Sequence, residues 1–577
     1  MTTLTPGDSL TVHPKYLCAK ALLVALLASG TTLLAQNPPA QGPADLIVTG
    51  ARVYTVDPAR PVVQAFAARN GRIVFAGSAA EAQALKGPNT RVMDLAGRTV
   101  VPGLTDAHAH LTGLGSALRS IDLTGSTSYE EVVARVAARA RQMRPGEWIR
   151  GRGWNQTLWA DTRFPTYDAL SRAVPDNPVI LGRVDGHAVL ANARAMELAH
   201  ITAQTPDPSG GRIIRDERGA ATGVFVDNAQ GLIGRVVPAP SEEEQKAAIL
   251  AAIAEANKWG LVGIHDAGVP QGTIELYEQL AREGHYNLRN YVMVSADSGS
   301  LAQYLARGPQ RALYDGRLWI RAIKIVSDGA LGSRGAAMLE DYSDDPGNKG
   351  LIRVAPERIE QIAELGLRAG FQVNTHAIGD RANRNVLDAY EQALKAVPTA
   401  DHRFRVEHAQ ILHRQDIARF AQLGVIPSMQ TSHQASDAAM TMNRIGWTRV
   451  QGAYAWRSLL NTGVIIPNGT DFPVEPVNPL LGFHAAITRQ DANNWPAGGW
   501  FPDERMTRQE ALESMTIWPA YAAFMEDVAG SITPGKYADF TVLDQDIMSI
   551  APERILDTHV VMTVLGGSVV YDAHNGQ

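Results

Sequence analysis

The chain has 577 residues, with 45% hydrophobic and 19% charged side chains, a formal net charge of -6 and a pI near 6.2. That length accommodates a barrel domain of roughly 250 to 400 residues together with a smaller module and an insertion. The mild negative charge and the scattered Lys and Arg residues give no basic field for nucleic acid or anionic lipid, so neither is an expected partner. We expect a small-molecule substrate. The composition is compatible with a monomer and with a homo-oligomer.

The N-terminal segment has the pattern of a secretory signal peptide. Two lysines precede an apolar run over residues 21–35, and a segment rich in Pro and Gly follows. We therefore predict a signal peptide over 1–36, a linker over 37–44, and export to the periplasm or the medium. If cleavage follows Ala35, the residue two positions earlier is Leu33, where signal peptides usually have a small side chain. An uncleaved anchor and a misassigned start codon are therefore the alternatives. Beyond this segment no stretch is apolar over the roughly 20 residues of a membrane span, so we expect no stable span after signal removal.

The cysteine content limits the chemistry. Cys18 is the only cysteine of the chain and lies inside the predicted signal peptide. The mature protein would then have no disulfide, no thiolate nucleophile and no Cys-ligated metal. Any metal ion must be held by histidines, carboxylates or a less usual ligand.

Both ends of the chain read as β-structure. Short runs rich in β-branched residues and bounded by Gly, Pro or Asp occur at residues 45–56, 71–77, 538–543 and 560–571. We predict that residues 45–98 and 530–577 together form one small β-sandwich.

The middle of the chain alternates between apolar runs that end in polar residues and helical stretches. The eight runs are Val100–His110, Val262–Asp266, Tyr291–Ser295, Ile320–Asp328, Phe371–His376, Phe404–His408, Val425–Gln430 and Val464–Asp471. This alternation predicts an α/β fold, a closed (β/α)8 TIM-type barrel over residues 99–529. The gap after the first run is too long for one crossover, so we place an inserted lobe at about 112–240.

Catalytic residues of such barrels lie at the C-terminal ends of the strands. The first run ends in Asp106, His108 and His110, which share one face because side chains alternate along a strand. A buried, hydrogen-bonded histidine pair is the alternative to a metal site. Three further strand ends supply His376, His408 and Asp471, so we favour convergent metal ligands.

In the fourth run, Lys324 lies four residues before Asp328, so both side chains should point into the barrel. Burial of Lys324 would favour its neutral amine, which can react with carbon dioxide to form an anionic carbamate ligand. The alternative is a salt bridge from Lys324 to Asp328 or Asp471.

These motifs resemble the amidohydrolase family 3 branch of the amidohydrolase superfamily. The likeness extends from Leu46 to Tyr571 and rests on Val101-Pro-Gly-Leu-Thr-Asp-Ala-His-Ala-His110, Lys324 with Asp328-Gly-Ala-Leu-Gly-Ser-Arg334, Thr375-His-Ala-Ile-Gly-Asp-Arg381, Val406-Glu-His408 and Gly469-Thr-Asp471-Phe-Pro473. It implies two divalent metal ions, usually Zn²⁺. The first would bind His108, His110 and Asp471, the second His376 and His408, with carboxylated Lys324 between them.

The resemblance implies hydrolysis of an amide-type C–N bond of a small molecule. A metal-bound hydroxide would attack the carbonyl carbon, with Asp471 as general base and then general acid. Deamination and lactone or ester hydrolysis are alternatives because the same attack does not choose its leaving group. A non-catalytic scaffold is a further alternative, which the complete ligand set disfavours.

Three residues outside this set are candidates for substrate binding. His187 resembles a family element that brings a histidine of the inserted lobe over the site, Arg334 could bind a substrate carboxylate or carbonyl, and Trp154 could form an aromatic wall. A structural turn, a surface ion pair and core packing are the respective alternatives.

Overall fold

A computed structural model describes residues 42–574. The predicted signal peptide, with Cys18, and most of the predicted linker lie outside these residues. In this described part, no helix combines the length and the apolar character needed to cross a membrane.

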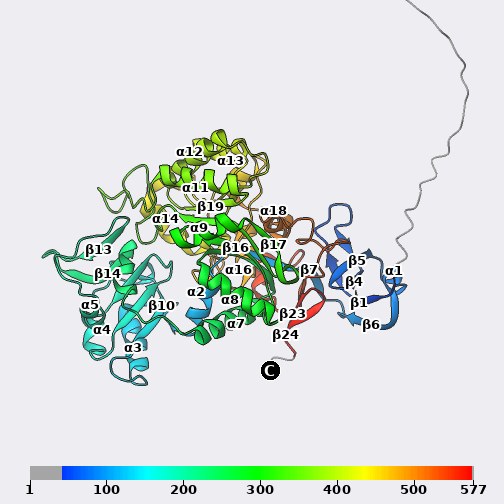
Figure 1. The fold of residues 1–577 in the computed structure, drawn as a ribbon, viewed down its shortest axis with the longest axis horizontal. Coiled ribbons are helices and arrows are strands. Elements are labelled where there is room, and N and C mark those ends of the chain that lie inside the picture. The colour runs from blue at the N-terminus through cyan, green and yellow to red at the C-terminus, as the bar shows by residue number, and fades with distance from the viewer. Residues whose placement is uncertain (1–41, 575–577) are drawn as a thin grey trace, which may run out of the picture. The chain divides into compact units, whose positions relative to one another are not determined.

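The centre of the chain forms a parallel barrel sheet (Figure 1). Its regular strands pair in chain order as β8 (Leu104–Ala109), β15 (Leu261–Val269), β16 (Arg289–Ser295), β18 (Leu318–Val326), β19 (Gln372–Ala377), β20 (Arg405–His408) and β21 (Ile426–Ser428). Each pair is parallel, as expected when a helix connects successive strands. The predicted α/β barrel is confirmed.

The eighth position of the barrel is not a regular strand. Between β21 and β8, the segment around Asn468 forms one isolated parallel bridge with Met429, and its carbonyl accepts from the Ala107 N–H at 3.1 Å. Pro467 lacks an N–H group and Asp471 has a φ of 58°, so extended pairing cannot run through this stretch. The prediction of a strand over Val464–Asp471 is therefore corrected to an irregular segment that closes the ring.

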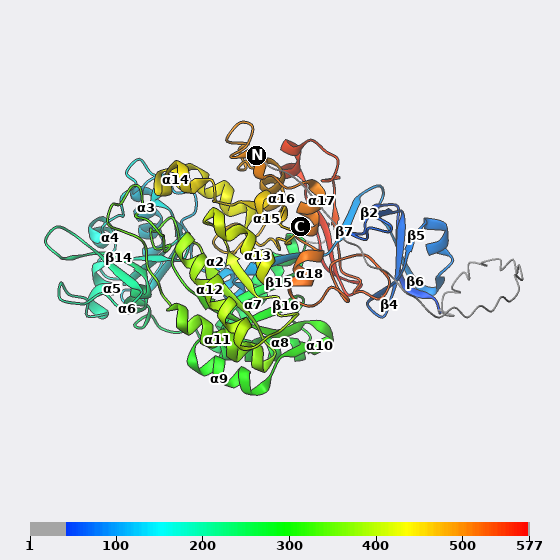
Figure 2. The same cartoon turned by 90° about the horizontal axis from the view of Figure 1, so that it is seen from above.

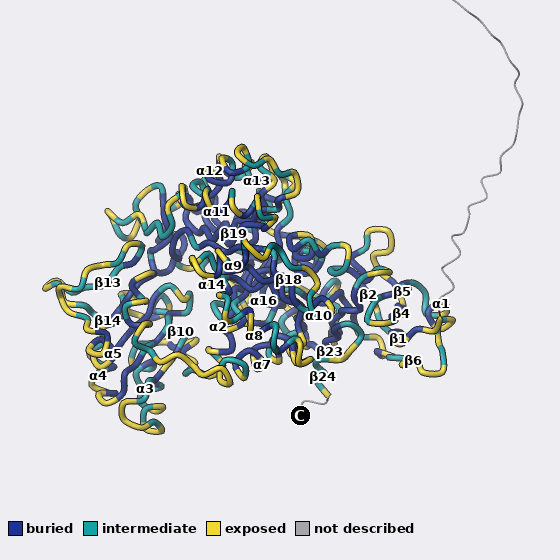
Figure 3. The backbone as a smooth tube through the Cα atoms, in the orientation of Figure 1, coloured by how far each residue is buried: buried dark blue, intermediate teal, exposed yellow. Residues whose placement is uncertain are grey.

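Amphipathic helices cover the outside of the barrel, as Figure 2 shows for α8, α9 and α11. These helices are α7 (Glu242–Lys258), α8 (Gln271–Arg282), α9 (Ser298–Arg307), α11 (Pro356–Ala369), α12 (Asp380–Ala396) and α13 (Ile417–Leu423). In α11 the buried positions Ile359, Ile362, Ala363 and Gly366 recur at helical spacing. This spacing places one apolar stripe against the strands, and the barrel centre is buried (Figure 3).

An inserted lobe lies in the chain between α2 (Leu111–Leu118), which follows β8, and α7. Its sheet contains β9 (Ile121–Asp122), β10 (Ile149–Trp154), β11 (Val179–Arg183), β12 (Ala188–Ala191), β13 (Gly211–Arg215) and β14 (Ala221–Asp227). The lobe has its own apolar core around Trp154, Leu181 and Val224. Such a core allows the lobe to hold side chains over the barrel at fixed positions.

The two chain ends meet in a β-structure of two sheets. One sheet contains β1 (Ala44–Thr49), β4 (Ala65–Arg69), β5 (Arg72–Gly77) and β6 (Lys86–Asp94); the other contains β2 (Arg52–Tyr54), β3 (Val62–Val63), β7 (Thr99–Pro102), β22 (Phe540–Leu543), β23 (Val560–Leu565) and β24 (Ser568–Asp572). Phe66 and Phe540 pack edge to face at 5.0 Å between the sheets. Buried Arg289 of the barrel donates from Nη2 to Asp539 Oδ1 at 2.9 Å, which ties this module to β16.

Candidate metal centre

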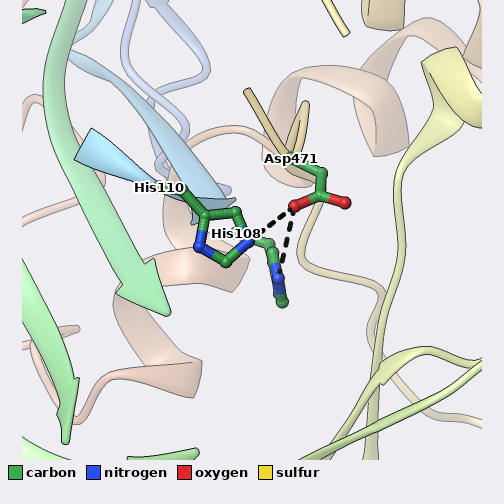
Figure 4. Close-up of side chains that lie close together, drawn as sticks. All are labelled: His108, His110 and Asp471. Atoms are coloured by element: carbon green, nitrogen blue, oxygen red, sulfur yellow. Dashed lines mark ion pairs between the residues drawn. The ribbon is translucent and has the colours of Figure 1, made fainter. Parts of the chain in front are cut away.

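The histidines at the end of β8 are oriented by partners on their Nδ1 atoms. Nδ1 of His108 contacts the buried carboxylate of Glu407, and Nδ1 of His110 lies 3.0 Å from the carbonyl oxygen of Ala267. Because those acceptors require an N–H donor, each neutral ring keeps a lone pair on Nε2. The two Nε2 atoms lie 3.6 Å and 3.0 Å, respectively, from Oδ1 of Asp471 (Figure 4). Both distances are close to the separation of about 3.3 Å between two ligand atoms of one tetrahedral zinc ion.

The backbone around Asp471 is fixed by β8. Its N–H donates to the carbonyl of His108 at 2.8 Å, and the hydroxyl of Thr470 donates to Asp106 Oδ2 at 2.6 Å. Oδ1 of Asp106 accepts from the N–H groups of His108 and Thr470 at 3.0 Å, so Asp106 holds the loop that carries Asp471.

Three more imidazoles gather beside His108. The ring of His408 lies 4.7 Å from that of His108 and 4.5 Å from that of His376, and His433 stacks on His408 at 5.8 Å. Nδ1 of His408 lies 2.7 Å from Gln430 Oε1, which again leaves Nε2 for a ligand role.

The distances define two triads that share one carboxylate. His108, His110 and Asp471 form the first, and His408, His433 and Asp471 form the second, with the ligand atoms of each triad within 4.8 Å of one another. His376, the expected partner of His408, lies beside the second triad and not in it, with Nε2 3.3 Å from Asp328 Oδ1. His433 was missed by the sequence reasoning, although it comes soon after the seventh apolar run, near the N-terminus of α14 (Thr431–Val450).

Burial sets the charge of these groups. It lowers the pKa of His108 to about 4 and the pKa of His376 and His408 well below the usual value, with neighbouring cations adding to the effect. Burial alone would raise the pKa of Asp471, but its contacts with His110 and His108 hold that pKa well below the usual value. Neutral imidazoles and an ionised carboxylate are the forms that bind a metal ion.

Lys324 lies at the same centre. Burial lowers its pKa to about 8, and its Nζ is 3.1 Å from Nε2 of His108. Among the described residues it forms no ion pair with Asp328 or Asp471. Asp328 instead accepts backbone N–H groups of Ala337, Ile378 and Gly379 at 2.8 to 3.0 Å.

The donor set fits divalent metal ions. Nε2 of His376, Nε2 of His433 and Oδ1 of Asp471 are buried and have no hydrogen-bond partner in residues 42–574. Buried polar atoms without partners are costly, and imidazole with carboxylate is the set that zinc prefers in the absence of thiolates. The centre opens into a cavity of about 670 Å³ that is also lined by residues of the inserted lobe.

A model of the amidohydrolase family matches residues 91–571. The chain belongs to the amidohydrolase family. The Arabidopsis thaliana protein LONG AFTER FAR-RED 3 is 34% identical over 554 residues, covering 94% of both chains. An N-substituted formamide deformylase of Arthrobacter pascens is 29% identical over 553 residues, covering 92% of this chain and 98% of that protein.

A solved structure shares the fold. It is an uncharacterized metal-dependent hydrolase from Pyrococcus horikoshii OT3, with a TM-score of 0.72, 27% identity, and coverage of 88% of this chain and 99% of that chain. The chain is therefore an amidohydrolase that shares its fold with a metal-dependent hydrolase.

The inserted lobe of this amidohydrolase contributes His187 to the cavity. Its ring lies 5.4 Å from that of His376, and its Nδ1 is 2.6 Å from Oδ1 of buried Asp227. His187 thus lines the cavity beside His376, and Asp227 is a partner that the sequence reasoning missed.

Two predicted substrate contacts lie elsewhere in the amidohydrolase. Trp154 is 0% exposed in the core of the inserted lobe, where its Nε1 donates to the Leu181 carbonyl at 2.8 Å. Arg334 has a φ of 57°, which turns its side chain to an ion pair with Asp344 at 3.0 Å. The arginines that line the cavity are instead Arg152, Arg183 and Arg353.

Proposed function

We propose that this amidohydrolase uses two divalent metal ions, most simply Zn²⁺, to hydrolyse an amide-type C–N bond of a small molecule. The observation that supports this proposal is the Asp471 carboxylate, which is common to both His-containing triads. Bound there, the two ions would lower the pKa of a water molecule and polarise the scissile carbonyl group.

Asp471 is proposed as the proton carrier. It lies at the irregular eighth segment with Oδ1 facing His108 and His110 and Oδ2 3.7 Å from Nε2 of His433. From this position it would take the proton of the attacking water and then deliver it to the leaving nitrogen.

His187 is proposed to stabilise the carbonyl oxygen. Asp227 accepts from Nδ1, which presents the opposite side of the ring to the cavity. Because Nδ1–H is donated to Asp227, Nε2 carries a proton only in the imidazolium, and the raised pKa of His187 favours that form. An Nε2–H donor aimed at the oxygen as its negative charge develops would lower the barrier to attack.

Lys324 is proposed to carry a carboxylate group between the two triads. Its depressed pKa makes the neutral amine available near pH 8. The amine nitrogen would bond to the carbon of CO₂ and release one proton, giving an anionic carbamate that supplies two ligand oxygens. His376 would bind on the side of His408, since their rings are 4.5 Å apart.

An amide is favoured over other carbonyl substrates by one relative. The Arthrobacter pascens protein, which is similar over 98% of its length, is named for the deformylation of N-substituted formamides. Formamides, N-acyl amino acids and cyclic amides are therefore the first substrates to test, with esters as the comparison.

The decisive variant is Asp471→Asn. It preserves shape and removes both the proton acceptor and the carboxylate charge shared by the two triads, so we expect kcat to fall by roughly 10²- to 10⁴-fold, at equal metal content, on any amide that the wild type hydrolyses. Asp544→Asn, an exposed aspartate paired with His559, is the matched control and should keep full activity. Wild-type kcat in Asp471→Asn would remove the proposed role.

A further inference from the structure

We propose that the cavity selects substrates whose leaving amine carries a carboxylate, and that Arg152 binds this carboxylate. N-acylated and N-formylated amino acids are the corresponding substrate class. The inference rests on the proposed function, because it names the substrates of the same site.

Arg152 reaches from β10 of the inserted lobe to the barrel. Its Nη2 donates to the carbonyl of Val184 at 2.8 Å, and its Nε donates to the carbonyl of Pro473 at 3.4 Å. These two bonds hold the guanidinium plane between the lobe and the loop that follows Asp471. Its Nη1 makes no hydrogen bond to any residue in 42–574, and the side chain lines the cavity.

Arg152 lacks a counter-ion in the described part of the chain. Its neighbour Arg183 is paired with Asp185, whereas no carboxylate lies within 4.0 Å of Arg152. Asp185 and Asp471 act on Arg152 only at longer range, while burial lowers its pKa. A half-buried guanidinium with free donors is the geometry that binds a carboxylate through two parallel hydrogen bonds.

The neighbours of Arg152 indicate on which side of the scissile C–N bond the substrate carboxylate would lie. A Cβ atom at Gly186 would lie 3.6 Å from Nη1 and 3.8 Å from Nη2, so the guanidinium packs against the turn that carries His187. On its other side it is bonded to Pro473, two residues after Asp471. Since Asp471 is the proposed proton donor to the leaving nitrogen, Arg152 lies on the leaving-group side of the scissile bond.

The acids on another wall of the cavity do not compete for Arg152. Asp437 accepts from the Tyr454 hydroxyl at 2.6 Å, and Glu475 accepts from the Ser436 hydroxyl at 2.6 Å. Burial raises the pKa of both acids. These acids disfavour a second anionic group, so the inference is for one carboxylate per substrate.

The first test compares two substrates that differ only in the carboxylate, N-formylphenylalanine and N-formyl-2-phenylethylamine. For Arg152→Gln we expect KM for the acid to rise roughly 10- to 100-fold, with less than about a threefold change for the neutral formamide. Arg152→Lys should recover part of the loss because it keeps the charge without the planar fork. Arg334→Gln, at the partly exposed ion pair with Asp344 outside the cavity lining, is the control and should change KM for neither substrate.

The second test does not depend on turnover. N-acetylphenylalanine and its methylamide are titrated calorimetrically into protein carrying Asp471→Asn, with and without Arg152→Gln, after elemental analysis has shown the same metal content in the two proteins. We expect Arg152→Gln to weaken only the acid, by the same 10- to 100-fold factor. Equal affinities for the acid in both proteins would overturn the inference, because a carboxylate held by the metal ions alone is indifferent to Arg152. If Arg152→Gln does not fold, Arg152→Lys replaces it, and undiminished acid affinity there has the same meaning. Failure of the proposed function is a separate result, namely that no amide of either kind is hydrolysed.

Discussion

Asp227 adopts a strained backbone conformation and places its Oδ1 2.6 Å from Nδ1 of His187. Its φ of 51° and ψ of -123° lie in a region that non-glycine residues rarely occupy. The carboxylate packs against Gly329 and Gly335, where an added Cβ would lie 2.5 Å from Oδ2. Strain of this kind persists only where the surroundings enforce it, which suggests that Asp227 positions His187 for function.

Asp227→Asn tests this positioning role. Burial lowers the pKa of His187, but the hydrogen bond and charge of Asp227 outweigh it and raise that pKa overall. In Asp227→Asn the carboxylate beside His187 is replaced by an uncharged side-chain amide, so we expect kcat to fall about 10- to 100-fold with little change in metal content. Asp216→Asn, at a turn outside the cavity lining, is the control. A variant with wild-type kcat would show that Asp227 serves the fold alone.

The Arg405 and Glu407 pair is a second target. Both side chains are 0% exposed; Arg405 Nε lies 2.7 Å from Glu407 Oε1, and Glu407 orients His108. Arg405→Leu leaves a buried carboxylate unpaired and should cost about 3–5 kcal/mol of unfolding free energy. The exposed pair of Arg554 with Asp557 gives the matched comparison, for which Arg554→Leu should cost at most about 1 kcal/mol. Thermal melts of the two variants check the difference, and equal melting temperatures would contradict it.

Gly379 tests the loop that follows β19. A Cβ there would lie 2.0 Å from the carbonyl oxygen of Ala337, which is backbone and cannot move freely. We expect Gly379→Ala to lower the melting temperature and to displace the side chain of His376, three residues earlier. Gly272→Ala, in the first turn of α8, has open space around its Cβ and should stabilise the protein by about 0.5 kcal/mol. The prediction fails if both alanines have the same effect.

The sequence predicted the barrel because apolar, strand-like runs alternate with helical stretches. It predicted that His108, His110, His408 and Asp471 lie together because the C-terminal ends of barrel strands converge, although Asp471 lies on an irregular segment and not on a strand. It could not predict the local backbone geometry. Arg152 and Trp154 should share one face of β10, but the strand register shifts between them and Gly153 has a φ of 108°, so Arg152 faces the cavity and Trp154 the core. The same limit applies to Arg334, whose turn conformation directs it to Asp344.

The contribution of His433 could not be predicted for a different reason. It lies on a helix and not at a strand end, and only the fold shows that α14 begins beside Asp471, with Nε2 of His433 3.7 Å from Oδ2. Its place in the second triad is therefore a result of tertiary packing.

The metal content of the purified protein tests the two-metal account most directly. Elemental analysis after gel filtration should give close to two equivalents of divalent transition metal per wild-type chain, and His433→Asn should reduce that number. A wild-type chain that hydrolyses amides with no bound metal, or with a single equivalent unaffected by His433→Asn, would contradict it.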